Sequence, residues 1–394
     1  MDIEAVKPPW ETIQFLQSPY LQDISGILYD LSWNEIPHEE LNKTKKRIEP
    51  LEANHSWENL KKKTNPYELV YTQDSNTETA PSISILKPLS RSYFKMIEML
   101  DILQFFDRLP KGTQRLRSAH VAEGPGGFIE AFLDRASARR IHVVKSSAMT
   151  LKPTNNHIPG WRRTYSFLQK HPEVKIHYGS DNTGDLYKIE NQKSFIQFSD
   201  KVLLFTGDGG FDFSVDYEHQ EKSVFPLLVA SALIGIQVLQ VDGVFVLKLF
   251  DLFSESTQLL IRTITVCFKE WTLYKPATSR PCNSERYLVC RGFRRIVGPS
   301  LKVLETMQAK WIEEKQFPRA PFFSFFTEDE KKFLESHIHT FDKTQNAVLE
   351  ETIELSEKNP NEFSWKSHIS YAYKWCSYFH IPTIALTHSN PLRA

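Results

Sequence analysis

Residues 118–140 constrain the fold more than any other part of this 394-residue chain. A short apolar run ends at Glu123, a Gly-Pro-Gly-Gly turn fills residues 124–127, and an amphipathic segment begins at Phe128. Glycine allows backbone conformations and close approaches that other residues do not, and the first turn of a helix carries unpaired N–H groups. The segment therefore predicts a strand, a tight turn and a helix, with a ligand site of nucleotide type at the turn.

The spacing of the turn narrows the choice of ligand. It matches neither the G-x-G-x-x-G fingerprint of dinucleotide sites nor the G-x-x-x-x-G-K-[ST] phosphate loop, which disfavours a nicotinamide oxidoreductase. The turn follows a carboxylate and contains no Lys or Arg, so it suits a ligand with little anionic phosphate. S-adenosylmethionine, with a ribose and a positive sulfonium, fits that description. A buried turn that needs glycine only for packing is the alternative.

Further apolar runs alternate with helical segments and predict an α/β fold with a mostly parallel sheet. The expected strands are residues 141–145, 174–178, 201–205 and 243–250. Two closing strands, 271–275 and 286–291, have no helix between them, which predicts a terminal antiparallel hairpin. Helices are expected at residues 90–109 and 218–239.

Charged side chains gather where these strands end. Glu123, Asp185, Asp208 and Lys248 all lie at or near the carboxyl end of a predicted strand, where open α/β sheets bind ligands. Lys248 stands in an otherwise apolar strand, and a buried ammonium needs a partner. Asp208 is the obvious partner, either in a functional pair or in a purely structural one.

The helix at residues 90–109 gives a weaker signal. Arg91, Lys95 and Glu98 fall on one stripe of this helix. Taken alone, the helix predicts an i,i+3 pair between Lys95 and Glu98 on a wet surface, worth about 0.2–0.5 kcal/mol.

The charge is unevenly distributed although the chain as a whole is neutral. Residues 91–180 hold 15 Lys and Arg against 7 Asp and Glu, whereas residues 301–394 hold 11 against 13. A basic segment around a ligand loop suits a polyanionic substrate, although acidic neighbours in the fold could balance it. The four cysteines show no zinc spacing, which indicates reduced thiols in a cytosolic or nuclear setting. The first residues do not resemble a secretory signal, and the apolar segment 225–241 falls short of a bilayer span.

Five ordered motifs resemble a known family. They are EGPGGF (123–128), GDGGF (207–211), KLFDLF (248–253), KPATSRPCNSERYLVC (275–290) and SRSYFKMIEM (90–99). Across residues 64–293 the chain is similar to the FtsJ-like RNA ribose 2′-O-methyltransferases, and more closely to the eukaryotic and viral messenger-RNA cap 2′-O-methyltransferases. The resemblance implies a Rossmann-like fold that binds S-adenosylmethionine, with a seven-stranded sheet.

The resemblance also implies a catalytic tetrad of Lys95, Asp208, Lys248 and Glu285, which replaces the surface role expected for Lys95. Lys248 would act on the weakly acidic 2′-hydroxyl as a base or cation, tuned by the carboxylates, while Lys95 would help to keep it neutral. No metal is expected.

The same resemblance implies the binding residues. The cofactor would be held by Ala122, Glu123, Gly124, Pro125, Gly126, Gly127, Phe128, Asp185 and Asp208. Asp181 is the alternative to Asp185. Cap-proximal RNA would contact Asn283, Ser279 and Arg280. The basic and aromatic residues Arg162, Arg163 and Trp161 suggest a further RNA contact.

The expected organisation is an N-terminal extension (1–88), a methyltransferase domain (89–298) and a C-terminal helical extension (299–394). The expected function is methylation of a cap-proximal ribose, with the first transcribed nucleotide favoured. Capped mRNA would be the partner, with the capping or transcription machinery as a further candidate and no membrane. The expected location is the nucleus or cytoplasm, or the host cytoplasm or virus factory for a viral member. The alternatives are a ribosomal or transfer-RNA ribose methyltransferase and an inactive RNA-binding paralogue.

Overall fold

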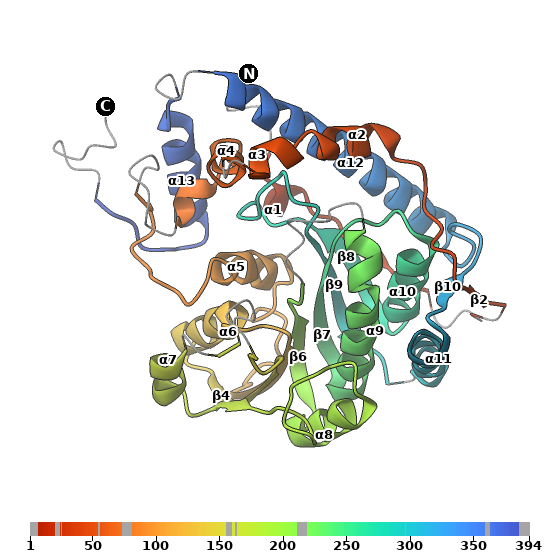
Figure 1. Cartoon of the computed structure of the whole chain (residues 1–394). Helices are drawn as coiled ribbons and strands as arrows, with labels where there is room; N and C mark the ends of the chain where they lie inside the picture. The colour runs from red at the N-terminus through yellow and green to blue at the C-terminus, as the bar shows by residue number, and fades with distance from the viewer. Residues whose placement is uncertain are drawn as a thin grey trace.

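An eight-stranded sheet forms the centre of the molecule in the computed structural model (Figure 1). The structure describes residues 7–19, 24, 26–53, 56–72, 81–154, 160–161, 164–210, 219–295, 297–358 and 363–385. The strand order is β1-β8-β9-β7-β6-β3-β4-β5. The strands are β1 (Leu16–Gln17), β3 (Arg115–Val121), β4 (His142–Met149), β5 (Val174–Ile176), β6 (Val202–Gly207), β7 (Leu239–Leu249), β8 (Phe268–Tyr274) and β9 (Arg286–Phe293).

The pairing confirms the predicted sheet and adds one strand to it. Strands β3 to β7 run parallel, whereas β9 pairs antiparallel with both β7 and β8. The seven expected strands are β3 to β9, and the short β1 adds an edge to β8. A separate two-stranded sheet joins β2 (Leu28–Asp30) to β10 (Phe317–Arg319).

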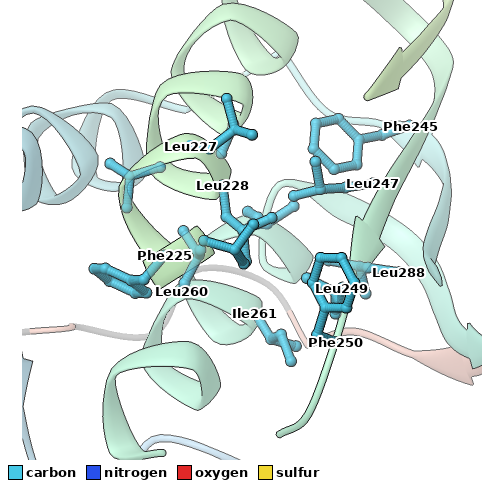
Figure 2. Close-up of a cluster of buried hydrophobic side chains, with 14 of the residues drawn as sticks. Phe225, Leu227, Leu228, Phe245, Leu247, Leu249, Phe250, Leu260, Ile261 and Leu288 are labelled. Atoms are coloured by element: carbon cyan, nitrogen blue, oxygen red, sulfur yellow. The ribbon is translucent and has the colours of Figure 1, made fainter. Parts of the chain in front are cut away.

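Helices cover both faces of the sheet because successive strand side chains point to opposite faces. One face packs against α5 (Ser92–Ile102), α6 (Gly127–Ala138) and α13 (Lys366–Tyr378). The other packs against α8 (Ile189–Ser199), α9 (Gln220–Val238), α10 (Glu255–Thr265) and α11 (Gly298–Glu314). The short α7 (Tyr165–Lys170) precedes β5. Figure 2 shows the core between α9, α10 and β7, to which Phe225, Leu247 and Leu260 contribute buried side chains.

Helix α9 is the one described helix that is long and apolar enough to cross a membrane by length and composition alone, so the expectation that this apolar segment falls short of a bilayer span is wrong. In this fold, 78% of its apolar window is buried within the protein. Helix α9 is therefore part of the hydrophobic core in this structure.

The two extensions pack against each other along one end of the sheet (Figure 1). The first contributes α1 (Pro9–Thr12), α2 (Glu39–Lys46), α3 (Glu49–Ala53), α4 (Trp57–Lys63) and a 3-10 turn, η1 (Glu68–Val70). Helices α2 and α4 pack on α12 (Glu328–Glu357). A capping box formed by Thr327 and Glu330 stabilises the start of α12. Between α2 and α3 the chain turns at Arg47, and Pro50 lies in the first turn of α3.

Candidate active site

The order of the strands places a ligand site between β3 and β6. From β3 the chain proceeds to β4 and β5 on one side, and it then returns to β6 and β7 on the other. Open α/β sheets bind ligands at such a switch point, beyond the carboxyl ends of the strands. A cavity of about 730 Å³ lies there, lined by Gly124, Asp185, Asp208 and Lys248 among others. The structure therefore brings three of the four predicted strand-end residues, Asp185, Asp208 and Lys248, to one cavity, whereas Glu123 does not line it.

The four predicted catalytic side chains form a continuous network. Lys95 Nζ lies 2.7 Å from Glu285 Oε1 and donates to Glu285 Oε2 at 2.8 Å. Lys248 Nζ lies 3.4 Å from Glu285 Oε2 and 3.6 Å from Asp208 Oδ1. Glu285 thus bridges the two lysines, and all four side chains are at least 85% shielded from solvent. Asp208, Lys248 and Glu285 line the cavity.

The electrostatics of this network keep Lys248 charged in this structure. Burial alone would lower the pKa of Lys248, but Asp208 and Glu285 outweigh burial and raise it above its ordinary value. Burial opposes ionisation of Glu285, yet Lys95 and Lys248 bring the pKa of its carboxyl well below the usual range. The expectation that Lys95 helps to keep Lys248 neutral stays a prediction, because the raised pKa of Lys248 reflects Asp208 and Glu285.

Tyr287 is a member of this network that the sequence did not reveal. Its hydroxyl donates to Asp208 Oδ1 at 2.8 Å, and its backbone pairs with Lys248 across β9 and β7. The side chain is fully buried and packs against Phe128, with 5.8 Å between the ring centroids. Its place in the YLV run made it look like an ordinary core residue.

Glu98 does not lie on the surface, so the expected exposed pair with Lys95 is wrong. The carboxylate of Glu98 is fully buried and accepts from Tyr274 Oη at 2.6 Å, from the backbone N–H of Ala277 at 2.7 Å and from Trp375 Nε1 at 3.0 Å. These donors satisfy the group and fix α5 against the segment that follows β8. The stripe shared by Lys95 and Glu98 faces the protein interior.

The glycine turn shapes both the cavity and the position of α5. A Cβ on Gly124 would lie 2.6 Å from the carbonyl oxygen of Gly160, and a Cβ on Gly127 would lie 2.3 Å from the hydroxyls of Ser90 and Ser92. Gly126 adopts a left-handed φ of 104°. Gly127 therefore lets the start of α5, which carries Lys95, approach the turn closely.

The remaining residues of the turn occupy two positions relative to the cavity. Ala122 lines it and has a left-handed φ of 55°, a conformation that costs a non-glycine residue roughly 1–2 kcal/mol. The turn residues that do not line the cavity are Pro125, Gly126, Gly127 and Phe128. Glu123 does not line it either, since it is fully enclosed beside Thr206 and His120, and burial raises the pKa of its carboxyl. Their predicted cofactor contacts stay predictions.

Asp185 and Asp181, the two aspartates proposed as alternatives, have different surroundings. Asp185 lines the main cavity, and its Oδ1 accepts from the backbone N–H of Tyr187 at 2.9 Å. Asp181 lies outside that cavity, where it pairs with Lys188 at 2.6 Å and accepts from Asn191. The geometry favours Asp185 as a ligand-facing residue.

Of the predicted RNA-contacting residues that the structure describes, only Asn283 lines the cavity. Ser279 is buried, and Arg280 holds Glu68 with two hydrogen bonds of 3.0 and 3.1 Å. Arg162 and Arg163 lie outside the described residues, and Trp161 is buried and does not line the cavity.

Lys275 anchors the segment that carries Glu285, a role that sequence reasoning missed. Its ammonium donates to the carbonyls of Asn283 and Glu285 at 2.7 and 2.8 Å and to Ser279 Oγ at 3.3 Å. Burial lowers its pKa to about 7, opposed by the negative charge of Glu285.

Both extensions also line the cavity, which the sequence did not indicate. Helix α12 contributes Gln345 and Leu349, and the N-terminal extension contributes a mixed set of side chains. That set is Lys45, Ile48, Trp57, Glu58 and Lys61. Within the described part of the chain, no group of three or more His, Cys, Asp or Glu could hold a metal ion.

Residues 88–293 match the FtsJ-like methyltransferase family. The chain belongs to this family. The match covers more than half of the chain and includes the whole tetrad, the glycine turn and strands β3 to β9. Membership accounts for the mostly parallel sheet with its antiparallel hairpin.

Relatives from three organisms show where the family likeness lies. A cap-specific mRNA (nucleoside-2′-O-)-methyltransferase 2 from Danio rerio is 32% identical over 212 residues, which cover 52% of this chain and 28% of the relative. A cap-specific mRNA (nucleoside-2′-O-)-methyltransferase 1 from Xenopus laevis is 33% identical over 227 residues, covering 52% and 26%. The corresponding Trypanosoma cruzi protein is 28% identical over 253 residues, covering 62% and 68%. The chain thus spans about a quarter of the two vertebrate relatives.

Proposed function

We propose that this FtsJ-like methyltransferase transfers a methyl group from S-adenosylmethionine to a ribose 2′-hydroxyl at the capped 5′ end of mRNA. The single observation that carries the proposal is the placement of the Lys248 amine. It lies between the carboxylates of Asp208 and Glu285, in the cavity that the glycine turn lines. The relatives named as cap-specific enzymes support the cap as substrate.

The residues present fit S-adenosylmethionine. Gly124 and Gly209 line the cavity, and both positions require glycine, since a Cβ on either would approach a neighbouring protein atom within 3 Å. Asp185 would hold the ribose hydroxyls, and Asp208 would hold the ammonium of the methionine end. No Lys or Arg occurs in the glycine turn, which agrees with a cofactor that lacks phosphate. When bound, the cofactor supplies an electrophilic methyl group.

The tetrad provides a route for activating the 2′-hydroxyl. The hydroxyl is a weak acid, so it gains nucleophilicity as its proton passes to a base. Lys248 would accept that proton once its amine is neutral, and Glu285 and Asp208 would hold the amine in line. The positive sulfonium of a bound S-adenosylmethionine would disfavour a second positive charge in this buried cavity. It would therefore lower the pKa of Lys248 and favour the neutral amine. Lys95 would balance the charge of Glu285 throughout.

The first transcribed nucleotide is the favoured acceptor. The KLFDLF and TSRPCNSERY motifs favour it, and in the structure these motifs supply Lys248, Asn283 and Glu285 to one cavity. Action on capped mRNA would place the protein in the nucleus or cytoplasm, where the capping or transcription machinery is a candidate partner. A ribosomal or transfer-RNA ribose methyltransferase is the second candidate, because the FtsJ-like family alone does not specify the cap.

The test compares capped and uncapped forms of one short RNA with radiolabelled cofactor. Product from the capped RNA is digested with nuclease, and the methylated nucleoside is identified. We expect methylation of the first transcribed ribose on capped RNA and little transfer to uncapped RNA. Equal transfer to both would contradict cap specificity, and no transfer to either would favour an inactive RNA-binding paralogue.

A further inference from the structure

Residues outside the family-matched segment form part of the cavity wall. Trp57 and Ile48 come from the N-terminal extension, and Gln345 and Leu349 come from α12. All four side chains are at least 92% shielded from solvent, so they form a defined wall. One aromatic ring and two aliphatic side chains suit a flat, weakly polar group.

The two extensions are tied to each other and to the catalytic strands. Thr64 Oγ1 lies 2.8 Å from Thr352 Oγ1, which joins the end of α4 to α12. Lys45 Nζ lies 3.1 Å from Asp251 Oδ2, three residues after Lys248. The wall therefore has a fixed position relative to the tetrad.

Gln345 presents a hydrogen-bond acceptor whose orientation is determined. Its Nε2 donates to the carbonyl oxygen of Cys282 at 3.0 Å. A carbonyl only accepts, so this contact requires the amide nitrogen on that side and leaves Oε1 on the other. Oε1 is buried and has no hydrogen-bond partner among the described residues. A buried, unsatisfied acceptor beside a cavity is costly unless a ligand donates to it.

We propose that this wall is a nucleobase slot, in which Gln345 Oε1 accepts a hydrogen bond from the exocyclic amino group of the bound base. The inference rests on the proposed function, because the RNA that presents the base is the substrate of the tetrad. Stacking on an aromatic ring stabilises a bound base of any identity. The fixed acceptor adds selection, because adenine, guanine and cytosine carry an exocyclic amine and uracil does not.

Two bases near the acceptor ribose could supply the amine: the cap guanine and the first transcribed base. The experiment therefore uses three labelled RNAs with the full chain and S-adenosylhomocysteine, which prevents turnover. One RNA has a guanosine cap followed by adenosine, one has inosine in place of the cap guanosine, and one has purine riboside in place of the adenosine. Binding is measured by fluorescence anisotropy.

We expect one of the two amine deletions to weaken binding by wild type about fivefold, as for one neutral hydrogen bond. Gln345→Met should bind the intact RNA about fivefold more weakly and lose the discrimination. Asn346→Ala is the matched control, since it removes an amide from the next residue of α12, which does not line the cavity.

Two results would overturn the slot. One is wild-type affinity for both amine-deleted RNAs within twofold of the intact RNA, a measurement that needs no variant to fold. The other is discrimination by a folded Gln345→Met equal to that of wild type. Methyl transfer to the intact RNA is measured separately, so a failure of the proposed function is distinguished from a failure of the slot.

Discussion

Lys95 Nζ lies 2.7 Å from Glu285 Oε1, although 190 positions separate the two residues in the chain. The contact joins α5 to the segment before β9. Glu285 also contacts the second lysine, because its Oε2 lies 3.4 Å from Lys248 Nζ. Two cations thus share one buried carboxylate beside the cavity. In this arrangement the charges of Asp208 and Glu285 together control the protonation of Lys248.

That control predicts a pH dependence of methyl transfer. Asp208 and Glu285 raise the pKa of Lys248 against the effect of burial, so only a small fraction of its amine is neutral at pH 7. If Lys248 acts as the base, log kcat/KM should rise with a slope near one between about pH 7 and 9. Glu285→Gln should lower the pKa of Lys248 and move this rise to lower pH. A level wild-type profile would assign Lys248 a purely cationic role.

Glu285 should also affect stability with a defined sign. Its folded pKa is lowered, so its ionised form contributes stability above the unfolded value of about 4.3, and this contribution is lost as the pH falls. Glu285→Gln should reduce the free energy of unfolding at pH 7 by about 3 kcal/mol, because two buried lysines lose a partner. It should also flatten the acid part of the profile in urea unfolding. Glu335→Gln, on the exposed side of α12, serves as the control, and the same loss in both variants would contradict this account.

Lys275 should act as a positioning residue. Lys275→Met removes three hydrogen bonds from the segment that ends at Glu285, and a displacement of about 1 Å in a catalytic group can cost a hundredfold in rate. We expect kcat to fall about 10- to 100-fold with little change in KM, together with a shifted pH profile. Lys269→Met, on the exposed part of β8, should leave both unchanged. A Lys275→Met enzyme with normal kcat would disprove the role.

The two aspartates of the loop after β5 allow cofactor binding to be tested with a pair of matched variants. Asp185 lines the cavity and Asp181 does not, although only four residues separate them. Asp185→Asn should weaken S-adenosylmethionine about tenfold or more in isothermal titration calorimetry, because hydrogen bonds to a charged group are worth about 1.5–3 kcal/mol. Asp181→Asn should bind within twofold of wild type. The reverse order would identify Asp181 as the ligand.

Much of the fold followed from the sequence because its signals are local. Apolar runs and the glycine turn predicted β3 to β9, and the strand ends predicted where Asp208 and Lys248 would meet. The role of Lys95 did not follow from its own helix, since i,i+3 spacing equally describes a surface pair; only the family resemblance indicated it. Glu98 was misplaced for the same reason, because its donors, such as Trp375, lie far away in sequence.

The contribution of the extensions to the cavity could not be predicted from local patterns. Gln345 reaches the cavity because α12 packs across α2 and α4, and that packing depends on contacts such as Thr64 with Thr352. Lys45 and Lys61 lie in a charge-dense stretch of the sequence, yet both line the cavity. Sequence periodicity identifies an apolar face but not the element that will cover it.

The most direct test of the central claim is methyl transfer to capped RNA by Lys248→Met, with cofactor affinity measured on the same preparation. If Lys248 activates the ribose hydroxyl, kcat should fall by about 10²–10⁴ while S-adenosylmethionine binds within threefold of wild type. Lys193→Met, on the exposed surface of α8, should keep full activity. A Lys248→Met enzyme that binds the cofactor normally and transfers methyl groups at the wild-type rate would contradict the account.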